Sequence, residues 1–390
     1  MQPTRSLHCL RRVLDDRLII LETYFGYHIQ QQNQITMSAA TYVKGFHDDE
    51  RTKKMCYHDL GATGMKVSVI GFGAAPLGKV YDADLTDEQG VSALRHALRG
   101  GINYIDTAPY YGQGKSEAVL GNALKDIPRE AYYIATKVGR YETADNPEGM
   151  FDFSAERVTR GVDESLKLLG LEYVDLIQVH DVEFASSVDL IIDETLPALE
   201  KIRKQGKAKF IGITGYPIQV LRTIVERSKV KIDTVLSYCH LSLNDSSLLQ
   251  QAAFFQERNV ALISASPLSM ALLTDSGPRS WHIASDEIKK ACREAGAYCR
   301  QHGHDISAIA LKYSISHTDV PLTLIGMDSK DQVDKNLKAV EEGSSEEPGR
   351  YLFTTNLINR FFSSIEQPGW EGIEVKRYRE ALSRLNEAKK

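Results

Sequence analysis

Between residues 57 and 340, short apolar runs alternate with longer amphipathic stretches. The short runs are rich in β-branched residues and carry few charges on either face. Runs of this kind are typical of strands that are buried on both faces, as in a parallel sheet. Eight strands are predicted in this way, at residues 67–73, 102–107, 132–138, 173–180, 208–214, 233–238, 260–266 and 321–326.

The stretches between these runs repeat apolar residues with a period near 3.6, which predicts a helix after each strand. Ser154, Ser246 and Ser285 are expected to cap helix starts, and three glycines are expected to end helices, at positions 100, 170 and 206. Eight successive strand–helix units predict an α/β fold, a closed (β/α)8 TIM barrel over residues 57–340. An open, doubly wound sheet is the competing arrangement.

The segments on either side of the repeat are predicted to be accessory parts. Two short strands at 57–60 and 65–66 predict a hairpin that caps the N-terminal end of the barrel. Residues 1–56 are expected to form a flexible N-terminal extension. Residues 341–390 are expected to form a C-terminal tail of loop and short helix that packs on the barrel and finishes in a solvated helix.

Composition narrows the class of protein. A net charge of −5 argues against a nucleic-acid-binding surface, and no apolar stretch of about 18 residues predicts a membrane span. Five scattered cysteines without metal-ligand spacing predict reduced thiols and no metal site. Asp15, Asp16 and Glu22 count against a mitochondrial transit peptide in residues 1–36, so a cytoplasmic monomer is expected.

Four ionisable residues are predicted to share one rim of the barrel. Reactive groups in such barrels stand at the C-terminal ends of the strands. Asp106 ends the second strand, Tyr111 lies in the loop after it, Lys137 lies late in the third strand and His180 ends the fourth. Each residue alone has an ordinary structural explanation, such as a turn cap or a core histidine. Their joint position predicts an active site.

Elementary electrostatics suggests a role for each of the four. Desolvating an unpaired carboxylate costs several kcal/mol, so Asp106 needs a partner, and the Lys137 ammonium can provide one. The same positive charge is expected to lower the pKa of Tyr111 from about 10 toward neutral pH. A neutral His180 can orient a substrate oxygen. The set therefore predicts proton transfer beside a hydride acceptor rather than covalent hydrolysis.

Four segments resemble the aldo-keto reductase superfamily: LGATGMKVSVIGFG, INYIDTAPYYGQGKSEAVLGNAL, YYIATKVG and YVDLIQVHD. The resemblance places Asp106, Tyr111, Lys137 and His180 on the catalytic tetrad, with Tyr111 as proton donor in reduction and acceptor in oxidation. LSYCHLSLNDSSLL, SASPLSMALLT and QPGWEGI resemble the plant-type L-galactose dehydrogenases and related sugar 1-dehydrogenases.

This resemblance implies oxidation of the anomeric carbon of an aldose such as L-galactose, with NAD as cofactor and an aldonolactone as product. Two alternatives stay open. The first is an NADPH-dependent aldehyde or ketone reductase with the same fold. The second, of a different class, is a cofactor-binding regulatory subunit that has no turnover.

The resemblance also implies nucleotide contacts. Met327 and Gln332 stand where NADPH-preferring relatives carry basic residues, and Asp328 would repel a 2′-phosphate, so NAD is expected. Lys330 and Lys335 are near, which leaves NADP open. The implied cofactor contacts are Thr214, Ser266, Leu268, Ser269, Gly326, Met327, Ser329, Gln332 and Asn336.

The substrate side is less defined by the sequence. Thr214 and Gly215 replace a Ser–Asn pair that binds the carboxamide in the wider family, and Ala265 replaces an aromatic residue. The expected walls of the substrate pocket are the loops 80–88, 140–153 and 274–286. In the last of these loops, Trp281 and His282 are candidate sugar contacts.

Overall fold

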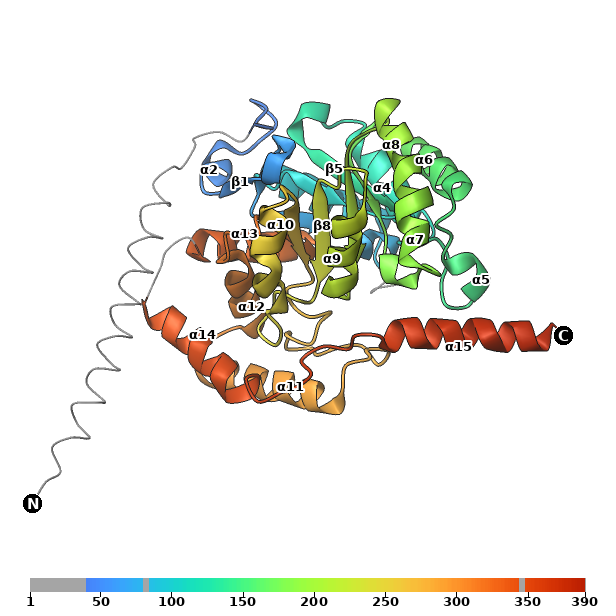
Figure 1. Cartoon of the computed structure of the whole chain (residues 1–390). Helices are drawn as coiled ribbons and strands as arrows, with labels where there is room; N and C mark the ends of the chain where they lie inside the picture. The colour runs from blue at the N-terminus through green and yellow to red at the C-terminus, as the bar shows by residue number, and fades with distance from the viewer. Residues whose placement is uncertain (1–39, 80–83, 344–347, 390) are drawn as a thin grey trace, which may run out of the picture. The chain divides into compact units, whose positions relative to one another are not determined.

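The strands form one closed barrel in the computed structural model, which describes residues 40–79, 84–343 and 348–389. All neighbouring barrel strands are parallel, and β10 pairs with both β9 and β3, which closes the sheet. The eight strands predicted from the apolar runs are therefore confirmed, and the open sheet is excluded (Figure 1). Their bounds are β3 Ile70–Gly73, β4 Tyr104–Asp106, β5 Tyr133–Val138, β6 Val174–Val179, β7 Ala208–Gly215, β8 Thr234–Tyr238, β9 Ala261–Ala265 and β10 Leu322–Gly326.

Helices surround the barrel as the period of 3.6 predicts. The Ser154 hydroxyl accepts a hydrogen bond from the Arg157 N–H at the start of one helix, and Ser285 caps another through the Ile288 N–H. Ser246, by contrast, precedes a 3-10 turn and makes no side-chain cap bond. The helices that follow the strands include α3 Asp87–Arg99, α4 Lys115–Leu124, α6 Ala155–Leu169, α8 Leu196–Lys204, α9 Ile218–Arg227, α10 Ala252–Gln256, α11 Asp286–Gln301 and α13 Lys330–Gly343.

The N-terminal hairpin closes one end of the barrel. Strand β1 (Tyr57–Asp59) pairs antiparallel with β2 (Lys66–Ser68), as predicted. Leu60, Met65 and Val67 of this hairpin are buried in one cluster with side chains from the starts of several barrel strands. The hairpin therefore acts as an apolar plug at the end opposite to the strand C-termini. Figure 1 shows β1 at the end of the barrel opposite to α11 and α15 (Ile373–Ala388).

Residues 40–56 contact the barrel, although they were predicted to belong to a flexible extension. The Asn103 amide donates to the Thr41 hydroxyl at 3.0 Å, and the Asp48 N–H donates to the Arg99 carbonyl at 2.9 Å. A short helix, α2 (Asp49–Thr52), follows these contacts directly, with Asp48 as its N-cap. The candidate transit peptide at residues 1–36 lies outside the described residues.

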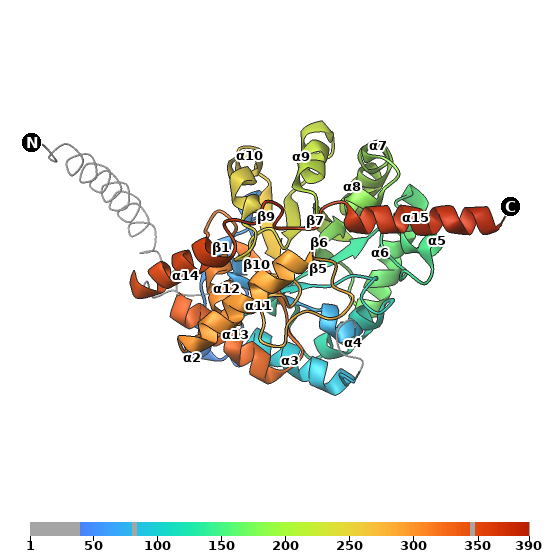
Figure 2. The same cartoon turned by 90° about the horizontal axis from the view of Figure 1, so that it is seen from below.

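The C-terminal segment contains two full helices, α14 (Pro348–Phe361) and α15. The segment was predicted to be a tail of loop and short helix that packs on the barrel and finishes in a solvated helix. Helix α15 has no fully buried residue, but one side of it meets the rim of the barrel, since the Tyr378 ring packs at 5.1 Å from Phe151 and 5.6 Å from Phe184. Figure 2 looks at this end of the barrel and shows α11 and α15 across it.

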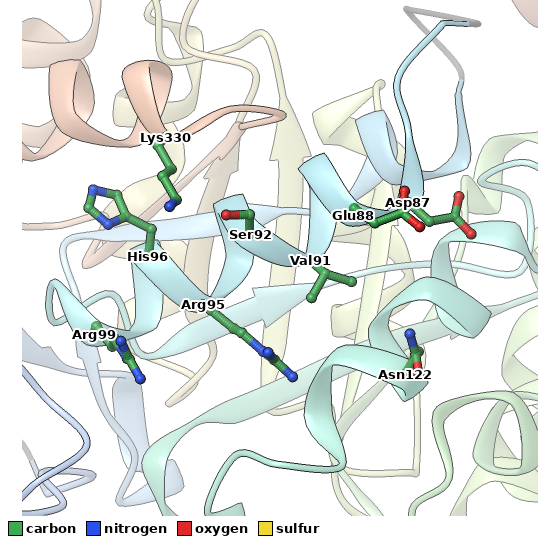
Figure 3. Close-up of a pocket in the computed structure, with 9 residues that line it drawn as sticks. All are labelled: Asp87, Glu88, Val91, Ser92, Arg95, His96, Arg99, Asn122 and Lys330. Carbon is green, nitrogen blue, oxygen red and sulfur yellow. The ribbon is translucent and has the colours of Figure 1, made fainter.

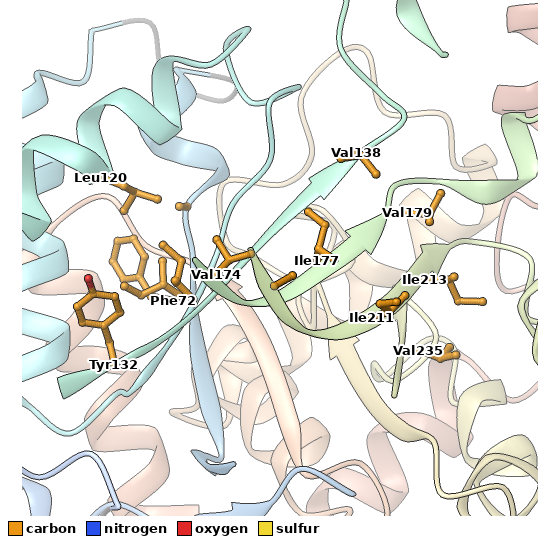
Figure 4. Packing of buried hydrophobic residues seen from close by; sticks show 14 of the residues in the cluster. Phe72, Leu120, Tyr132, Val138, Val174, Ile177, Val179, Ile211, Ile213 and Val235 are labelled. Atoms are coloured by element: carbon orange, nitrogen blue, oxygen red, sulfur yellow. The ribbon is translucent and has the colours of Figure 1, made fainter. Parts of the chain in front are cut away.

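The main hydrophobic core lies between the barrel strands and the surrounding helices (Figure 4). Side chains alternate along each strand, so that Ile177 and Val179 of β6 point to the helices. Leu176, which precedes them on the opposite face of the strand, belongs to the cluster inside the barrel. The same alternation directs Gln178 and His180 inward, toward the C-terminal end of the barrel.

Candidate active site

The alternation along three neighbouring strands brings polar side chains into the barrel above the apolar plug. Ala135 of β5 belongs to the inner apolar cluster, so Lys137, two residues later, also faces inward. Tyr104 of β4 also belongs to the inner cluster, so Asp106, two residues later on the same strand, faces inward as well. These strands pair in register, with Lys137 opposite Gln178. Asp106, Lys137 and Gln178 therefore form one buried polar layer.

Lys137 and Asp106 form a buried ion pair. The Lys137 side chain is 2% exposed and that of Asp106 is 5% exposed. The Lys137 ammonium donates to the Asp106 carboxylate and to the Thr107 carbonyl, the latter at 2.9 Å. The Gln178 amide donates to the second Asp106 oxygen at 2.9 Å. Both carboxylate oxygens thus have a donor, as a buried carboxylate requires.

Tyr111 reaches this pair through its hydroxyl. The Lys137 Nζ lies 3.3 Å from the Tyr111 Oη and 4.9 Å from the centre of its ring. The His180 ring meets the Tyr111 ring edge-on, with centroids 5.9 Å apart. The structure therefore brings together all four residues that were predicted from the strand-end rule, which places reactive groups at or just after the C-terminal ends of the strands.

The pKa of Tyr111 moves opposite to the prediction from sequence. Burial raises this pKa well above 10, and the negative charges of Asp106 and Asp181 raise it further. Only the Arg140 guanidinium is a notable opposing influence. The expected lowering fails because the Lys137 charge is already paired with Asp106. Tyr111 is consequently a neutral phenol, able to donate a proton, at neutral pH.

His180 is a neutral imidazole at this rim, as predicted. Its pKa is lowered to about 3, mainly by burial. The negative charge of Asp181 opposes this lowering, whereas the positive charges of Lys137 and Arg140 add to it. Within the described residues, its Nδ1 atom has no hydrogen-bond partner. A neutral ring with an unused nitrogen can hydrogen-bond to a hydroxyl or carbonyl oxygen of a substrate.

Two residues next to the tetrad were missed by the sequence reasoning. The Arg140 Nη1 donates to the Asp181 carboxylate at 2.6 Å, and the Arg140 guanidinium lies 3.7 Å from the centre of the Tyr110 ring. Asp181 directly follows His180, and Arg140 comes three residues after Lys137. The strand-end rule that selected the tetrad would have reached both residues if it had been extended past the ends of the strands.

A second carboxyl group is buried beside this pair. The Glu183 carboxylate accepts a hydrogen bond from the Tyr216 N–H at 2.9 Å. Burial, reinforced by the charge of Asp181, raises the pKa of Glu183 to about 8. From the C-terminal helix α15, Glu374 accepts a hydrogen bond from the Tyr238 hydroxyl at 3.1 Å. No local motif marks Glu374, because its partner lies 136 residues away in the sequence.

The implied nucleotide contacts fall on three rim segments, at the end of β7, after β9 and after β10. Thr214 accepts a hydrogen bond from the Asp181 N–H at 3.1 Å, and the Ser269 hydroxyl donates to the Asn244 carbonyl oxygen at 2.6 Å. Met327 is fully buried in the hydrophobic core, so only its backbone could meet a nucleotide. Leu268 is half-buried and packs against the core, Gly326 is exposed, and Ser329, Gln332 and Asn336 lie at the start of α13.

The candidate sugar contacts Trp281 and His282 differ in exposure. Trp281 is 47% exposed, whereas His282 is buried. One ring nitrogen of His282 pairs with the Ser269 carbonyl at 3.1 Å, and the other accepts from the Ala284 N–H at 3.1 Å. To bind a sugar hydroxyl, His282 would have to give up one of these bonds.

The sequence matches the Aldo/keto reductase family over residues 69–348, which is most of the chain and nearly all of the barrel. The protein belongs to the aldo-keto reductases. It is 47% identical to an L-galactose dehydrogenase of Arabidopsis thaliana over 286 residues, covering 73% of this chain and 87% of that protein. It is 35% identical to a D-arabinose 1-dehydrogenase of Saccharomyces cerevisiae, covering 64% of this chain and 76% of that protein.

A solved aldo-keto reductase of Bacillus halodurans, in its holo form, has the same fold. It superposes with a TM-score of 0.64 at 28% identity and covers 78% of this chain and 96% of its own. Aldo-keto reductases use nicotinamide cofactors.

The rim of this aldo-keto reductase has backbone that fits such a cofactor. The loop after β9 contains four non-glycine residues in the left-handed region, namely Ser266, Ser269, Met270 and Ala271, with φ between 47° and 75°. Non-glycine residues adopt this conformation rarely, and they cluster where a loop clamps a ligand. Helix α13 follows β10, the strand next to β9, and a helix N-terminus of this kind suits a phosphate. The rim therefore fits a dinucleotide.

A separate cleft lies outside this site. A cleft of about 410 Å³ runs along the outer face of α3 toward Lys330 and contains none of the tetrad (Figure 3). Its charged groups are largely paired within the protein, because Asp87 bonds Lys115 and Arg95 bonds Asp126. His96, also in this cleft, pairs with Asp334 at 2.8 Å. Several of its charged side chains are therefore engaged in ion pairs on the protein surface.

Two further observations concern the described part of the chain. Within residues 40–79, 84–343 and 348–389, no group of three His, Cys, Asp or Glu side chains is arranged to hold a metal ion. In the same ranges, no helix has the length and apolar character needed to cross a membrane.

Proposed function

We propose that this aldo-keto reductase is an NAD-dependent sugar 1-dehydrogenase that oxidises the anomeric carbon of an aldose such as L-galactose to the aldonolactone. The observation that carries the proposal is the contact of the Tyr111 hydroxyl with the buried Lys137–Asp106 pair, 3.3 Å from the Lys137 Nζ and beside the His180 ring. The relatives from Arabidopsis and yeast, both named as sugar dehydrogenases, support an aldose as the substrate.

In the proposed mechanism, Tyr111 and His180 hold the anomeric hydroxyl between them. NAD at the rim would supply the acceptor for the hydride that leaves C1. Tyr111, as tyrosinate, accepts the hydroxyl proton while the C1–O bond becomes a carbonyl. Lys137 hydrogen-bonds the tyrosinate oxygen, and Asp106 with Gln178 holds Lys137 in place. Neutral His180 donates to the substrate oxygen and adds no charge of its own.

The preference for NAD is supported by the start of α13. The Gln332 side chain accepts a hydrogen bond from the Asp328 N–H at 3.2 Å. Its amide oxygen is therefore already bonded to the preceding loop. Lys330 lines the cleft on α3. A 2′-phosphate would meet the Asp328 carboxylate, which disfavours NADP.

Initial rates with a panel of aldoses test the proposal. L-Galactose, L-fucose and D-arabinose would each be assayed with NAD and with NADP, and the product identified as lactone by mass. We expect turnover with L-galactose and at least a tenfold higher kcat/KM with NAD. Absence of turnover with every aldose, although NAD binds, would refute the proposal and favour a regulatory subunit instead.

The second candidate is an NADPH-dependent carbonyl reductase. The observation in its favour is the raised pKa of Tyr111, which keeps the proton on the phenol and suits donation to a carbonyl oxygen. Rates with NADPH and 4-nitrobenzaldehyde separate the two candidates. A kcat/KM that exceeds the value for NAD with L-galactose would favour the reductase.

A further inference from the structure

Arg140 and Asp181 are fixed at the rim by the local backbone. Gly139, at φ +101°, turns the chain after β5 so that Arg140 faces back over the strand ends. Asp181 itself has φ +53°, which is rare for a residue other than glycine. Its N–H donates to the Thr214 hydroxyl oxygen, which holds this conformation. The pair is therefore a constrained feature, and strain of this kind concentrates at functional sites.

The pair lies within electrostatic reach of the reacting groups. Arg140 and Asp181 both influence the pKa of Tyr111 and the pKa of His180. The Asp181 carboxylate is 3.7 Å from the His180 Nε2. The Tyr110 ring, against which Arg140 stacks, is 6.0 Å from the His180 ring, centre to centre. A substrate oxygen held by Tyr111 and His180 would therefore have this pair beside it.

The pair has hydrogen-bonding capacity that the protein does not use. A guanidinium has five N–H donors in a rigid fork. The Arg140 Nη1 is bound to Asp181, but the buried Nε has no partner within the described residues. The Asp181 carboxylate can accept further bonds. A donor fork beside a carboxylate, above the flat face of Tyr110, matches two neighbouring hydroxyls on a sugar ring.

The surrounding charges disfavour an anionic ligand here. Burial raises the pKa of Glu374 of α15, and the nearby charge of Arg140 opposes this rise. Glu374 also bonds the Tyr238 hydroxyl. Asp181 and Glu374 thus balance the positive charge of Arg140. A neutral polyol suits this arrangement better than a sugar phosphate or a sugar acid.

We infer that Arg140 and Asp181 form a subsite that binds two neighbouring ring hydroxyls of the aldose and so selects cyclic sugars as substrates. The inference rests on the proposed aldose oxidation and adds to it the residues that recognise the sugar. Arg140 donates hydrogen bonds to the hydroxyl oxygens, and Asp181 accepts a hydrogen bond from one hydroxyl and fixes the orientation of the fork.

The chain offers a control pair. Arg129, whose side chain is 26% exposed, bonds the buried Asp175, with Nη2 to Oδ2 at 2.7 Å, at the other end of β5 and β6. Asp175 also pairs with Lys209 at 3.0 Å. Arg129 also stacks on aromatic rings, at 4.9 Å from Tyr132 and 4.4 Å from Tyr173. R129Q therefore removes the same kind of contact far from the tetrad.

The test is a double-mutant cycle in which one change is made in the protein and the other in the substrate. Wild type, R140Q, D181N and R129Q would be assayed with NAD and L-galactose, its 2-, 3- and 4-deoxy forms, and L-fucose, which lacks only the 6-hydroxyl. We expect R140Q to lower kcat/KM for L-galactose 10- to 100-fold, mainly through KM. Each of the two ring-deoxy sugars that lack a bound hydroxyl should be a poor substrate for the wild type, yet lose no more than about threefold further with R140Q. L-Fucose should lose activity with R140Q as L-galactose does.

Three results would overturn the inference. The first is a loss in R140Q that multiplies fully with every deoxy sugar, since a structural role predicts independent effects. The second is an equal loss in R129Q. The third is rescue by R140K to wild-type KM, which would show that charge without the fork suffices. Failure of the wild type to oxidise any aldose is distinct, because it removes the proposed function itself and the subsite with it.

Discussion

Replacement of Lys137 by Met tests whether the ammonium compensates Asp106. Met fills a similar volume without the charge. Asp106, 4% exposed, would keep only the Gln178 amide at 2.9 Å as a donor to its carboxylate. Breaking a buried pair by removing one partner costs about 3–5 kcal/mol, because an unpaired charge is left behind. We expect K137M to lower the free energy of unfolding by this amount.

The double variant K137M/D106N provides the sharper measurement. It leaves no buried charge, so its free energy of unfolding should recover most of the loss, to within roughly 1–2 kcal/mol of the wild type. Urea unfolding of wild type, K137M, D106N and the double variant gives the coupling between the two residues, expected at roughly 2–4 kcal/mol. The m-values should stay constant across the four proteins.

Additive losses would refute this reasoning. If K137M and D106N each destabilise and their effects simply sum, Lys137 does not compensate Asp106. In that case the buried carboxylate must be balanced by another group. All four proteins should be compared at one pH and one salt concentration. Because the pair is buried, we also expect its coupling energy to change little between low and moderate salt.

Three further predictions concern pH. Because burial raises the pKa of Tyr111, log kcat/KM for aldose oxidation should rise with slope near one from pH 7 upward, and a flat profile would contradict a tyrosine base. The pKa of His180 is lowered from 6.5 to about 3, so its contribution to stability is full above pH 6.5 and is lost as the pH falls toward 3. Urea unfolding should therefore show that H180Q loses less stability than the wild type between pH 6 and pH 4. The pKa of Glu183 is raised from 4.5 to about 8, so its contribution to stability is full below pH 4.5 and is lost as the pH rises through 8. E183Q should therefore unfold at nearly the same urea concentration at pH 6 and pH 9. A decline in the stability of E183Q as large as that of the wild type would count against a buried neutral carboxyl group at position 183.

The barrel and the tetrad were accessible from sequence for one physical reason. Strands buried on both faces and separated by helices indicate a parallel sheet, and eight such units match a closed barrel. Once the strands are placed, the strand-end rule selects residues without any side-chain geometry. Lys137 follows Ala135 at the spacing of two that keeps a side chain inside the barrel, so even its direction follows from the pattern.

Other features depend on information that a single sequence lacks. Helix α12 (Ile306–Ile315) was missed because it is apolar on several sides and has no clear period. The contact of Tyr238 with Glu374 joins residues 136 positions apart, and no motif connects them. The pKa of Tyr111 was predicted in the wrong direction because proximity to Lys137 was foreseen, whereas the extent of burial and the pairing of that lysine were not.

The central claim is that the Tyr111 hydroxyl, held by Lys137 in the buried layer with Asp106, carries the proton of an aldose oxidation. Single-turnover rates of wild type and Tyr111→Phe with NAD and L-galactose test it most directly, with NAD affinity measured alongside. The account predicts a loss of 10²-fold or more in the hydride-transfer rate at pH 8, with NAD affinity and the free energy of unfolding nearly unchanged. A Tyr111→Phe protein that transfers hydride at the wild-type rate would contradict it.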